Sequence, residues 1–361
     1  MKHIIFTLLL FTVCMNTTGQ TEQYENSSSD GTVGKIVDEF NVTPNGQFNY
    51  EIPITTVSGT GGMVPQLSIS YSSANKSGLL GYGFDLTGLS QISRAPENLY
   101  RDGKADVIRF DSSDRFVLDG QRLSLVNTTA SYREYRTEIN SFSKIIAEGD
   151  VINPSKFTVY TKDGIIHEYT SAKVLMGTSG DNLYWLETKV SDTKGNYYAI
   201  SYFGDTNNNE YRPKQIDYTG NSDTSLSPYA SIRFNYQHIN RTPSYISGIK
   251  SLRSYVINNI SIYYGNKQTR QYDISYSTSR GNLFISQITE TAGNEKKKPT
   301  SFSWSNSDGY DMEIERMPLD LNFQNQRIAI GDFNGDGMAD FIAYSNKKSL
   351  LGYKVYIKND G

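Results

Sequence analysis

Cysteine is almost absent from the 361-residue sequence, which has a single cysteine, Cys14, together with 3 histidines and 2 tryptophans. Cys14 lies in an N-terminal segment that we expect to be cleaved off, so the mature chain is predicted to have no disulfide, thiol nucleophile or thiolate metal site. Basic residues are not in excess, because the sequence has 35 Lys and Arg in total and 38 Asp and Glu. The net charge of −3 gives no electrostatic reason to expect a nucleic acid or an anionic membrane as partner.

The N-terminal segment, residues 1–19, has the pattern of a Sec-type secretory signal peptide. Ile4–Val13 is an apolar run that follows a short basic start and is too short to span a bilayer. Thr17 and Gly19 are small residues at the positions expected before a cleavage site. Lipid attachment at Cys14 is the alternative, although the residue before it is not small. No later stretch is a transmembrane candidate, so the protein is predicted to be secreted or on the cell surface.

Tyrosine and short alternating runs of apolar residues characterise the rest of the chain. The sequence has 27 Tyr and 16 Phe, residues that favour strands. Leu67, Ile69 and Tyr71 alternate with serines, which is the period of a half-buried strand. Similar runs, separated by turn signals, occupy residues 156–161, 232–236, 259–264 and 272–276. The pattern predicts an all-β fold of many short antiparallel strands in a sandwich or curled sheet over residues 39–305, after a flexible polar leader at 20–38.

One motif near the C-terminus has the composition of a cation-binding loop. Oxygen-bearing side chains occupy its first, third, fifth and ninth positions, namely Asp332, Asn334, Asp336 and Asp340. The backbone carbonyl of Met338 would supply a further ligand, and the intervening glycines let the loop turn tightly. Oxygen ligands of this kind suit Ca²⁺ better than Mg²⁺. Without a cation these carboxylates would repel one another, which disfavours the alternative of an Asx-rich turn that binds no metal.

The residues around this loop exclude a helical calcium site. An EF-hand would need a glutamate at position 12, where the sequence has Ala343, and both flanks are strand-like. Gly331–Asp340 instead matches G-D-x-N-G-D-G-x-x-D, the core of the integrin-type FG-GAP repeat, which this segment resembles. The resemblance implies that residues 325–361 form a partial β-propeller blade, after a linker at 306–324. A propeller closes with roughly four to eight blades, so we expect the sequence to be a fragment of a longer protein.

A second group of short motifs is spread between residues 38 and 305. The motifs are Tyr50–Ile54, Gly61–Tyr71, Gly78–Phe84, Ile92–Arg94, Asp114–Gly120, Trp185–Asn196 and Pro299–Trp304. As a set they resemble the N-terminal domain of the SpvB and Tc-toxin B-component family. Phe84 stands where that family usually has tryptophan, an aromatic exchange that we expect to preserve the packing.

This resemblance implies an architectural role without catalysis. In Tc-toxin B-components the corresponding region is rich in β-structure and, with later Rhs repeats, helps to build a hollow shell around a toxic C-terminal payload. An FG-GAP-type propeller follows it and docks the pore-forming component. We therefore expect a secreted, non-enzymatic module of a Tc/Rhs-type virulence protein. Its expected partners are other toxin-complex components or downstream parts of the same polypeptide.

A cell-surface protein is the main alternative. A calcium-dependent adhesin or glycan-binding protein would share the signal peptide, the tyrosine-rich strands and the calcium loop. The sequence downstream would discriminate between the two hypotheses. Rhs-type repeats would favour the toxin shell, whereas further calcium repeats and an anchoring tail would favour the adhesin.

An ADP-ribosyltransferase is a remote alternative, because SpvB-type proteins can carry such a domain. That chemistry uses an arginine, a Ser-Thr-Ser strand and a Glu-x-Glu pair. The sequence contains Ser277–Ser279 and Glu313–Glu315, with Arg253 and Arg270 upstream. The two motifs lie on different sides of the predicted domain boundary, which disfavours an enzyme. The two histidines of the mature chain lie in alternating strand patterns and are interpreted as structural.

Overall fold

The structure, a computed structural model, describes residues 32–172, 180–240, 243–279, 281–304, 326–331, 333, 340–345 and 353–356. Strands dominate these residues, whose helical elements are one four-residue helix, α1 (Leu99–Asp102), and one 3₁₀ turn, η1 (Thr60–Gly62). Neither helical element of this described part is long and apolar enough to cross a membrane. The chain divides into two compact units, Met1–Trp304 and Ser305–Gly361. The predicted all-β class is confirmed.

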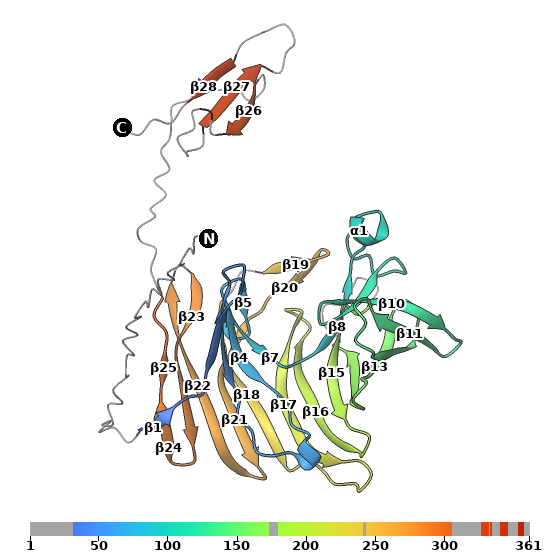
Figure 1. Cartoon of the computed structure of the whole chain (residues 1–361), viewed down its shortest axis with the longest axis vertical. Helices are drawn as coiled ribbons and strands as arrows, with labels where there is room; N and C mark the ends of the chain where they lie inside the picture. The colour runs from blue at the N-terminus through green and yellow to red at the C-terminus, as the bar shows by residue number, and fades with distance from the viewer. Residues whose placement is uncertain are drawn as a thin grey trace, which may run out of the picture. The chain divides into compact units, whose positions relative to one another are not determined.

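Eight consecutive strands of the first unit close into a barrel, seen at the right of Figure 1. Each strand runs antiparallel to the next, and pairing of the first with the last completes the ring. The strands are β8 (Gln91–Ala95), β9 (Arg115–Leu118), β10 (Gln121–Thr128), β11 (Tyr132–Thr137), β12 (Lys144–Gly149), β13 (Pro154–Tyr160), β14 (Ile166–Ser171) and β15 (Tyr184–Ser191). Closure depends on the pairing of Ile92 with Trp185, which local alternation along the sequence does not reveal.

Aromatic side chains fill the interior of the barrel. Phe116, Phe157 and Trp185 pack edge to face, with ring centroids 5.1–5.3 Å apart. Trp185 is fully buried, and its indole N–H donates a 2.7 Å hydrogen bond to the carbonyl of Pro154. Burying a side chain of this size contributes about 1.5–3 kcal/mol, so the aromatic cluster holds the ring of strands together.

Strand β15 belongs both to the barrel and to a large open sheet. Along one edge it pairs with β14, from Trp185 to Ser191. Along its other edge, the first residues pair with β8, and the last residues, from Lys189 to Ser191, pair with the next strand of the open sheet. The barrel and the sheet are therefore joined through one continuous strand.

The open sheet continues from β15 mostly in chain order. Its long strands are β16 (Asn196–Asp205), β17 (Glu210–Asn221), β18 (Ala230–His238), β21 (Tyr255–Tyr264), β22 (Lys267–Ser279) and β23 (Asn282–Ala292). The short strands β24 (Glu295–Lys298) and β25 (Thr300–Ser301) pair with β23. β1 (Thr32–Lys35) joins β24 in parallel, whereas every other ladder of the described residues is antiparallel, as the sequence predicts.

A small four-stranded sheet covers one face of the open sheet, so this part of the unit is a sandwich (Figure 1). Its strands are β2 (Glu39–Val42), β3 (Phe48–Pro53), β4 (Ser68–Ser72) and β7 (Phe84–Thr87). Fully buried side chains from both layers form the core, among them Ile52 and Phe84 of the small sheet and Ile232 and Ile260 of the large one. The sequence predicts a sandwich or a curled sheet; the structure has a sandwich, together with a closed barrel that the sequence does not predict.

The predicted alternation is found in and beside β4. Leu67 and Ile69 are buried, whereas Ser68 and Ser70 are half-buried. Phe84 is also buried, and three aromatic rings lie 4.9–6.2 Å from its own, those of Tyr71, Phe302 and Trp304. Phenylalanine at this position therefore still takes part in a dense aromatic cluster.

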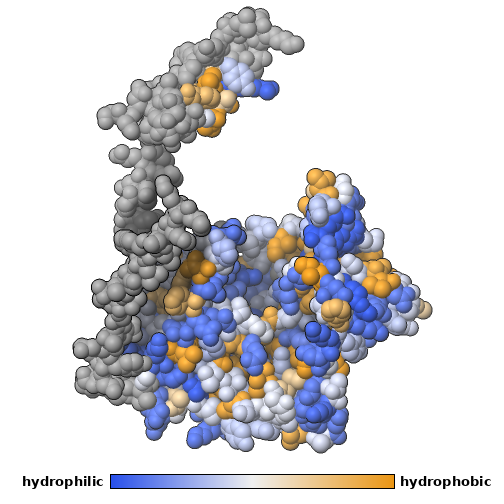
Figure 2. Space-filling model, in the orientation of Figure 1, coloured by the Kyte–Doolittle hydropathy of each residue, from blue (hydrophilic) through white to orange (hydrophobic). Residues whose placement is uncertain are grey.

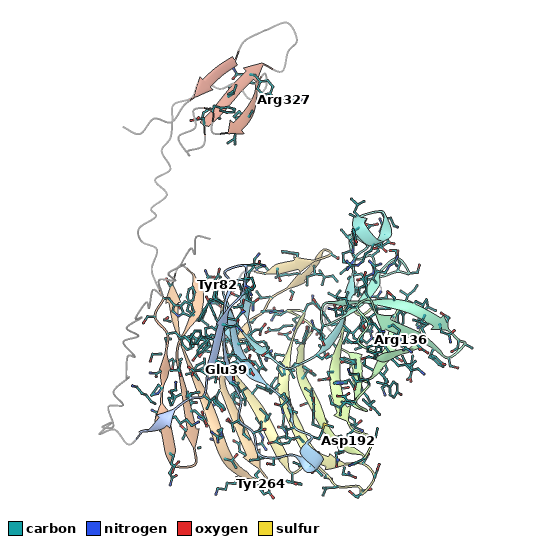
Figure 3. The ribbon with its side chains drawn as sticks, in the orientation of Figure 1. Glu39, Tyr82, Arg136, Asp192, Tyr264 and Arg327 are labelled. Carbon is teal, nitrogen blue, oxygen red and sulfur yellow. The ribbon has the colours of Figure 1, made fainter. Side chains whose placement is uncertain are left out.

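Two short hairpins complete the first unit. They consist of β5 (Ser77–Gly78) with β6 (Gly81–Tyr82), and of β19 (Ser244–Ile246) with β20 (Ile249–Ser251). Figure 1 shows both at one end of the sandwich, the end marked by Tyr82 in Figure 3. Tyr264 and Asp192 mark the opposite end of the unit in the same view.

The second unit contains a three-stranded antiparallel sheet among its described residues. Its strands, in spatial order, are β26 (Gln326–Gly331), β27 (Asp340–Ser345) and β28 (Tyr353–Tyr356). The predicted signal peptide at 1–19 and the predicted linker at 306–324 lie outside the described residues, as does most of the leader. The propeller blade stays a prediction.

Candidate functional site

The two ends of the predicted calcium loop are described in the second unit. Gly331 ends β26 and Asp340 begins β27, and the two residues are direct partners in the ladder, which closes the loop between them. Asp340 is 1% exposed, and its Oδ2 accepts a 2.9 Å hydrogen bond from the backbone N–H of Phe333. The last predicted ligand is therefore a buried carboxylate in contact with the backbone of the loop.

The other predicted ligands, Asp332, Asn334, Asp336 and Met338, lie outside the described residues. Within the residues that are described, no three His, Cys, Asp or Glu side chains converge as metal ligands would. Asp340 fits the ninth position of a calcium loop, because a buried carboxylate needs hydrogen-bond donors or a cation to offset the loss of water. The calcium site stays a prediction.

Two of the described elements of the ADP-ribosyltransferase alternative, the Ser-Thr-Ser segment and Arg270, lie in regular strand pairing or in an ion pair, whereas Arg253 is exposed. Ser277–Ser279 ends β22 and pairs with the start of β23 in a hairpin. Arg270 forms an ion pair with Glu290, whose other carboxylate oxygen accepts a 2.9 Å hydrogen bond from Lys297. Glu313–Glu315 lies outside the described residues. The contacts of Arg270 therefore indicate a structural role.

A buried guanidinium group lies within the barrel. The side chain of Arg94, on β8, is 1% exposed, and its Nη1 lies 3.3 Å from Oδ2 of Asp114, which is equally buried. Its Nε and Nη2 donate to the backbone carbonyls of Asn182 and Ile152 at 2.6 and 2.5 Å. Burial lowers the pKa of Arg94, an effect that the charge of Asp114 opposes. Three aromatic rings surround the guanidinium at 5.5–5.7 Å, those of Phe110, Phe116 and Trp185.

A second buried charge lies on β15. The side chain of Glu187 is 3% exposed, and its Oε1 lies 2.6 Å from Nδ1 of His167 on β14. Burial raises the pKa of Glu187 above its ordinary value of 4.5, and the contact with His167 opposes that shift. The hydroxyl of Ser90 is bonded to Asp119 and Tyr169 rather than to this histidine. These contacts match the structural role predicted for His167.

Sequence reasoning did not single out the buried charges, although the alternation carries a signal for them. Ile92 and Arg94 are two residues apart on β8, as Trp185 and Glu187 are on β15, and all four are buried. A charged residue in register with buried apolar neighbours indicates a buried, partnered charge. The partner itself cannot be read in this way, since Asp114 is 20 positions from Arg94.

Comparison with protein families assigns most of the first unit. Residues 42–280 match the SpvB family, described as Salmonella virulence plasmid 65kDa B protein. The chain belongs to the SpvB family. The matched segment of this SpvB-family protein includes the entire barrel, from Gln91 to Ser191, and the open sheet as far as β22. A comparison with curated proteins found no match.

Solved structures that share the fold of this SpvB-family protein come from toxin proteins. A crystal structure of TcdB2-TccC3 aligns with a TM-score of 0.67 at 13% identity, over 93% of this chain and 19% of that chain. The Tc holotoxin pore from Photorhabdus luminescens aligns with a TM-score of 0.66 at 13% identity, over 88% of this chain and 18% of that chain. The N-terminal domain of effector protein SpvB from Salmonella typhimurium strain LT2 aligns with a TM-score of 0.56 at 15% identity, over 67% and 99% of the two chains.

The extent of these matches differs between the two kinds of relative. The SpvB-family chain spans 19% of the TcdB2-TccC3 chain but matches 99% of the SpvB N-terminal domain. Because the first unit ends at Trp304, a match over 93% of the 361 residues reaches into the second unit. At these identities the likeness establishes the fold.

Proposed function

We propose that this SpvB-family protein is a secreted, non-enzymatic structural module of a Tc/Rhs-type toxin protein, contributing to the shell that encloses or delivers a toxin payload. The observation that carries this proposal is the shared fold with TcdB2-TccC3 over 93% of the chain. The buried charges of the barrel support it, because Arg94 and Glu187 are held by fixed protein partners, Asp114 and His167. Each of these two buried charges therefore already has a partner, as expected of a structural part of the protein.

The surface of the small sheet offers a place for neighbouring parts of a shell. β2 is the last strand of that sheet among the described residues, so its outer edge has no partner there. Phe40 and Val42 on this strand are 74% and 63% exposed. Apolar residues on a free edge favour association with another chain. Much of the face visible in Figure 2 is hydrophilic by comparison.

Cross-linking mass spectrometry on the natively tagged protein, purified from the organism that encodes it, tests the structural role. We expect cross-links between lysines of this chain, such as Lys35, and an Rhs-repeat polypeptide or segment. We also expect electron micrographs of the same sample to show a hollow particle. A protein that runs as a free monomer and adheres to cells would refute the shell and support the adhesin alternative.

Absence of catalysis is tested with labelled NAD. We expect no transfer of ADP-ribose to proteins of a cell lysate by the full chain. This expectation rests on Arg270, which already has a structural partner in Glu290. The variant Glu313→Gln/Glu315→Gln should therefore give the same result as the parent. Labelling that the parent catalyses and the double variant does not would make the protein an enzyme.

We further propose that Asp332, Asn334, Asp336, Asp340 and the carbonyl of Met338 bind one Ca²⁺. Asp340 supports this assignment, because it is buried and bonded to the loop backbone. The ion would be bound within the loop whose two ends, Gly331 and Asp340, are paired in the β26–β27 ladder.

Hydrogen exchange in β26 and β27 is the measurement for the calcium proposal. Ca²⁺ at about 100 times its dissociation constant stabilises the bound state by about 2.7 kcal/mol, so exchange of these amides should slow roughly a hundredfold. The variant Asp332→Ala/Asp336→Ala should lose this response, and Asp223→Ala, an exposed aspartate of the first unit, should keep it. If the double variant responds to Ca²⁺ as the parent does, the site assignment is wrong.

A further inference from the structure

A cleft of about 910 Å³ lies in the first unit, where the barrel meets the sandwich. Its walls come from β5, β7, β8 and β15, from the turn between β16 and β17, from the β19–β20 hairpin and from the turn between β22 and β23. This is the end of the sandwich that Tyr82 marks in Figure 3. A cleft of this size can hold a small molecule of several rings.

A buried carboxylate with unused bonding capacity lies in the wall of the cleft. Glu210, the first residue of β17, is 3% exposed. Its Oε2 accepts a 2.9 Å hydrogen bond from the backbone N–H of Ser254, whereas its Oε1 has no hydrogen-bond partner. Burial raises the pKa of Glu210. An unpaired buried oxygen is costly, so a ligand that displaces the atoms covering Oε1 and donates a hydrogen bond to it recovers free energy.

A free cation borders the same cleft. Arg253 is exposed and makes no hydrogen bond or ion pair with any side chain of the described residues. It is near enough to act electrostatically on Glu210 and on Tyr184. Asp85 is the other carboxylate of the wall, and its Oδ1 is already occupied by two backbone N–H groups. Glu210 therefore supplies an acceptor, and Arg253 supplies donors.

Aromatic and amide side chains line the cleft between these two groups. The rings of Tyr184 and Tyr211 lie 5.4 Å apart at an angle of 56°. The hydroxyl of Tyr211 donates to Oε1 of Gln91 at 2.7 Å, which fixes the amide and leaves its NH₂ group able to donate. The side chains of Asn240 and Asn282 also contribute to the lining.

The backbone around the cleft does not favour an extended peptide as the occupant. A bound strand would need free N–H and C=O groups on a sheet edge. On β20 and just after it, the carbonyl of Lys250 accepts from the side chain of Asn209, and the N–H of Leu252 donates to the carbonyl of Asn208. Both edges of β8 are paired as well. Recognition in this cleft must therefore use side chains.

We propose that the cleft binds a short neutral oligosaccharide. A sugar hydroxyl both donates and accepts hydrogen bonds, so one ligand can donate to Glu210 and accept from Arg253. A ligand with a single fixed charge would be attracted by one of these residues and repelled by the other. The apolar C–H face of a pyranose ring can pack on Tyr184 and Tyr211. This site goes beyond the structural role proposed above and does not depend on it.

Titration of the full chain with three trisaccharides, followed by saturation-transfer NMR, tests the proposal. Maltotriose, cellotriose and triacetylchitotriose are each added to about 10 mM, so that millimolar affinities register. We expect at least one to bind, and we expect Arg253→Ala and Glu210→Gln each to weaken that binding about tenfold or more. Arg101→Ala, which removes an exposed arginine of α1 outside this cleft, should leave it unchanged.

Each other outcome overturns the proposal. Failure of all three saccharides to bind would show that the cleft is not a carbohydrate site. Binding that Arg253→Ala does not weaken would place the sugar elsewhere, and this variant stays informative even if Glu210→Gln fails to fold, because Arg253 is exposed. Diglycine is the second probe, because a zwitterion could also satisfy both charges. If diglycine binds and the saccharides do not, the proposed ligand class is wrong.

Discussion

Replacing Arg94 with methionine removes the buried guanidinium of the barrel while keeping an unbranched apolar side chain in its place. The change breaks the contact with Asp114 and the hydrogen bonds to the carbonyls of Asn182 and Ile152. Asp114 then remains buried, with its carboxylate bonded only to the backbone N–H groups of Arg109 and Phe110 among the contacts described. The expected result is a large loss of barrel stability.

The size of this loss follows from the burial of both partners. Each side chain of the pair is 1% exposed, so solvent can screen or rehydrate neither charge. Removing one member of a buried ion pair costs about 3–5 kcal/mol. For a urea dependence of about 2 kcal/mol per molar, the unfolding midpoint should fall by about 1.5–2.5 M.

Tryptophan fluorescence during unfolding in urea measures the change. Urea is chosen as the denaturant because, unlike guanidinium chloride, it does not screen charges. The chain has 2 tryptophans, Trp185 in the barrel and Trp304 in the sandwich, so a Trp304→Phe background makes the signal specific for the barrel. Arg101→Met is the matched control, because the side chains of Arg101 and its partner Glu138 are 41% and 37% exposed. An exposed pair of this kind contributes little to stability.

A double variant separates the charge from the packing. Arg94→Met/Asp114→Asn should recover part of the lost stability, because the buried charge left by the first substitution is removed by the second. The reasoning is refuted if Arg94→Met shifts the midpoint no more than the Arg101 control. It is also refuted if the double variant loses the full sum of the two single effects.

Three further outcomes are expected. Burial raises the pKa of Glu187 in the folded state. The protonated carboxyl therefore contributes stability that is fully present below pH 4.5 and is lost as the pH rises through the raised folded pKa. Glu187→Gln should flatten that part of a plot of the urea midpoint against pH. Gly88→Ala should destabilise the folded state by about 2 kcal/mol or more in the same assay, because the φ angle of Gly88 is +96° and an added Cβ would overlap a backbone carbonyl. Gly120→Ala is the control and should cost less, because Gly120 has a similar φ of +83° but open space around the added Cβ. Arg122 holds the pKa of Asp102 well below its ordinary value of 3.8, so Asp102→Asn should lower the melting temperature near pH 7. The difference from the parent should shrink as the pH falls below 3.8 and should disappear only once the pH is below the lowered folded pKa.

The strand content could be predicted because it follows from local alternation, and the sandwich is one of the two arrangements that this alternation allows. Leu67 and Ile69 are buried where the period of two places them, and the runs at 232–236 and 259–264 lie in β18 and β21. The barrel could not be predicted in this way. Its closure rests on the pairing of β8 with β15, whose first residues are separated by more than ninety positions, and alternation within a strand carries no information on which distant strand lies beside it.

The candidate site divides in the same way between local and distant information. A calcium loop concentrates its ligands within nine consecutive positions, so Asp332 to Asp340 can be proposed as such a loop from the sequence alone. The cleft beside Glu210 and Arg253 combines side chains from β8, β15 and β17 and from the hairpins, and only the fold brings them together. Glu210 carries no local signal, because the cleft that it borders is also lined by residues more than 130 positions away, such as Ser77 and Leu79.

The shared strand β15 makes the barrel an insert whose two ends lie side by side. The chain leaves the small sheet after Thr87 and joins the open sheet at Lys189, and the first and last strands of the barrel, β8 and β15, are hydrogen-bonded neighbours. The distance between the two ends of the insert is therefore set by the pairing of β8 with β15 and not by the length of the segment between them, which is the arrangement that makes insertions tolerable in a domain. Any change to the insert must preserve the end of β15, because residues 189–191 pair with β16 and so connect the barrel to the open sheet.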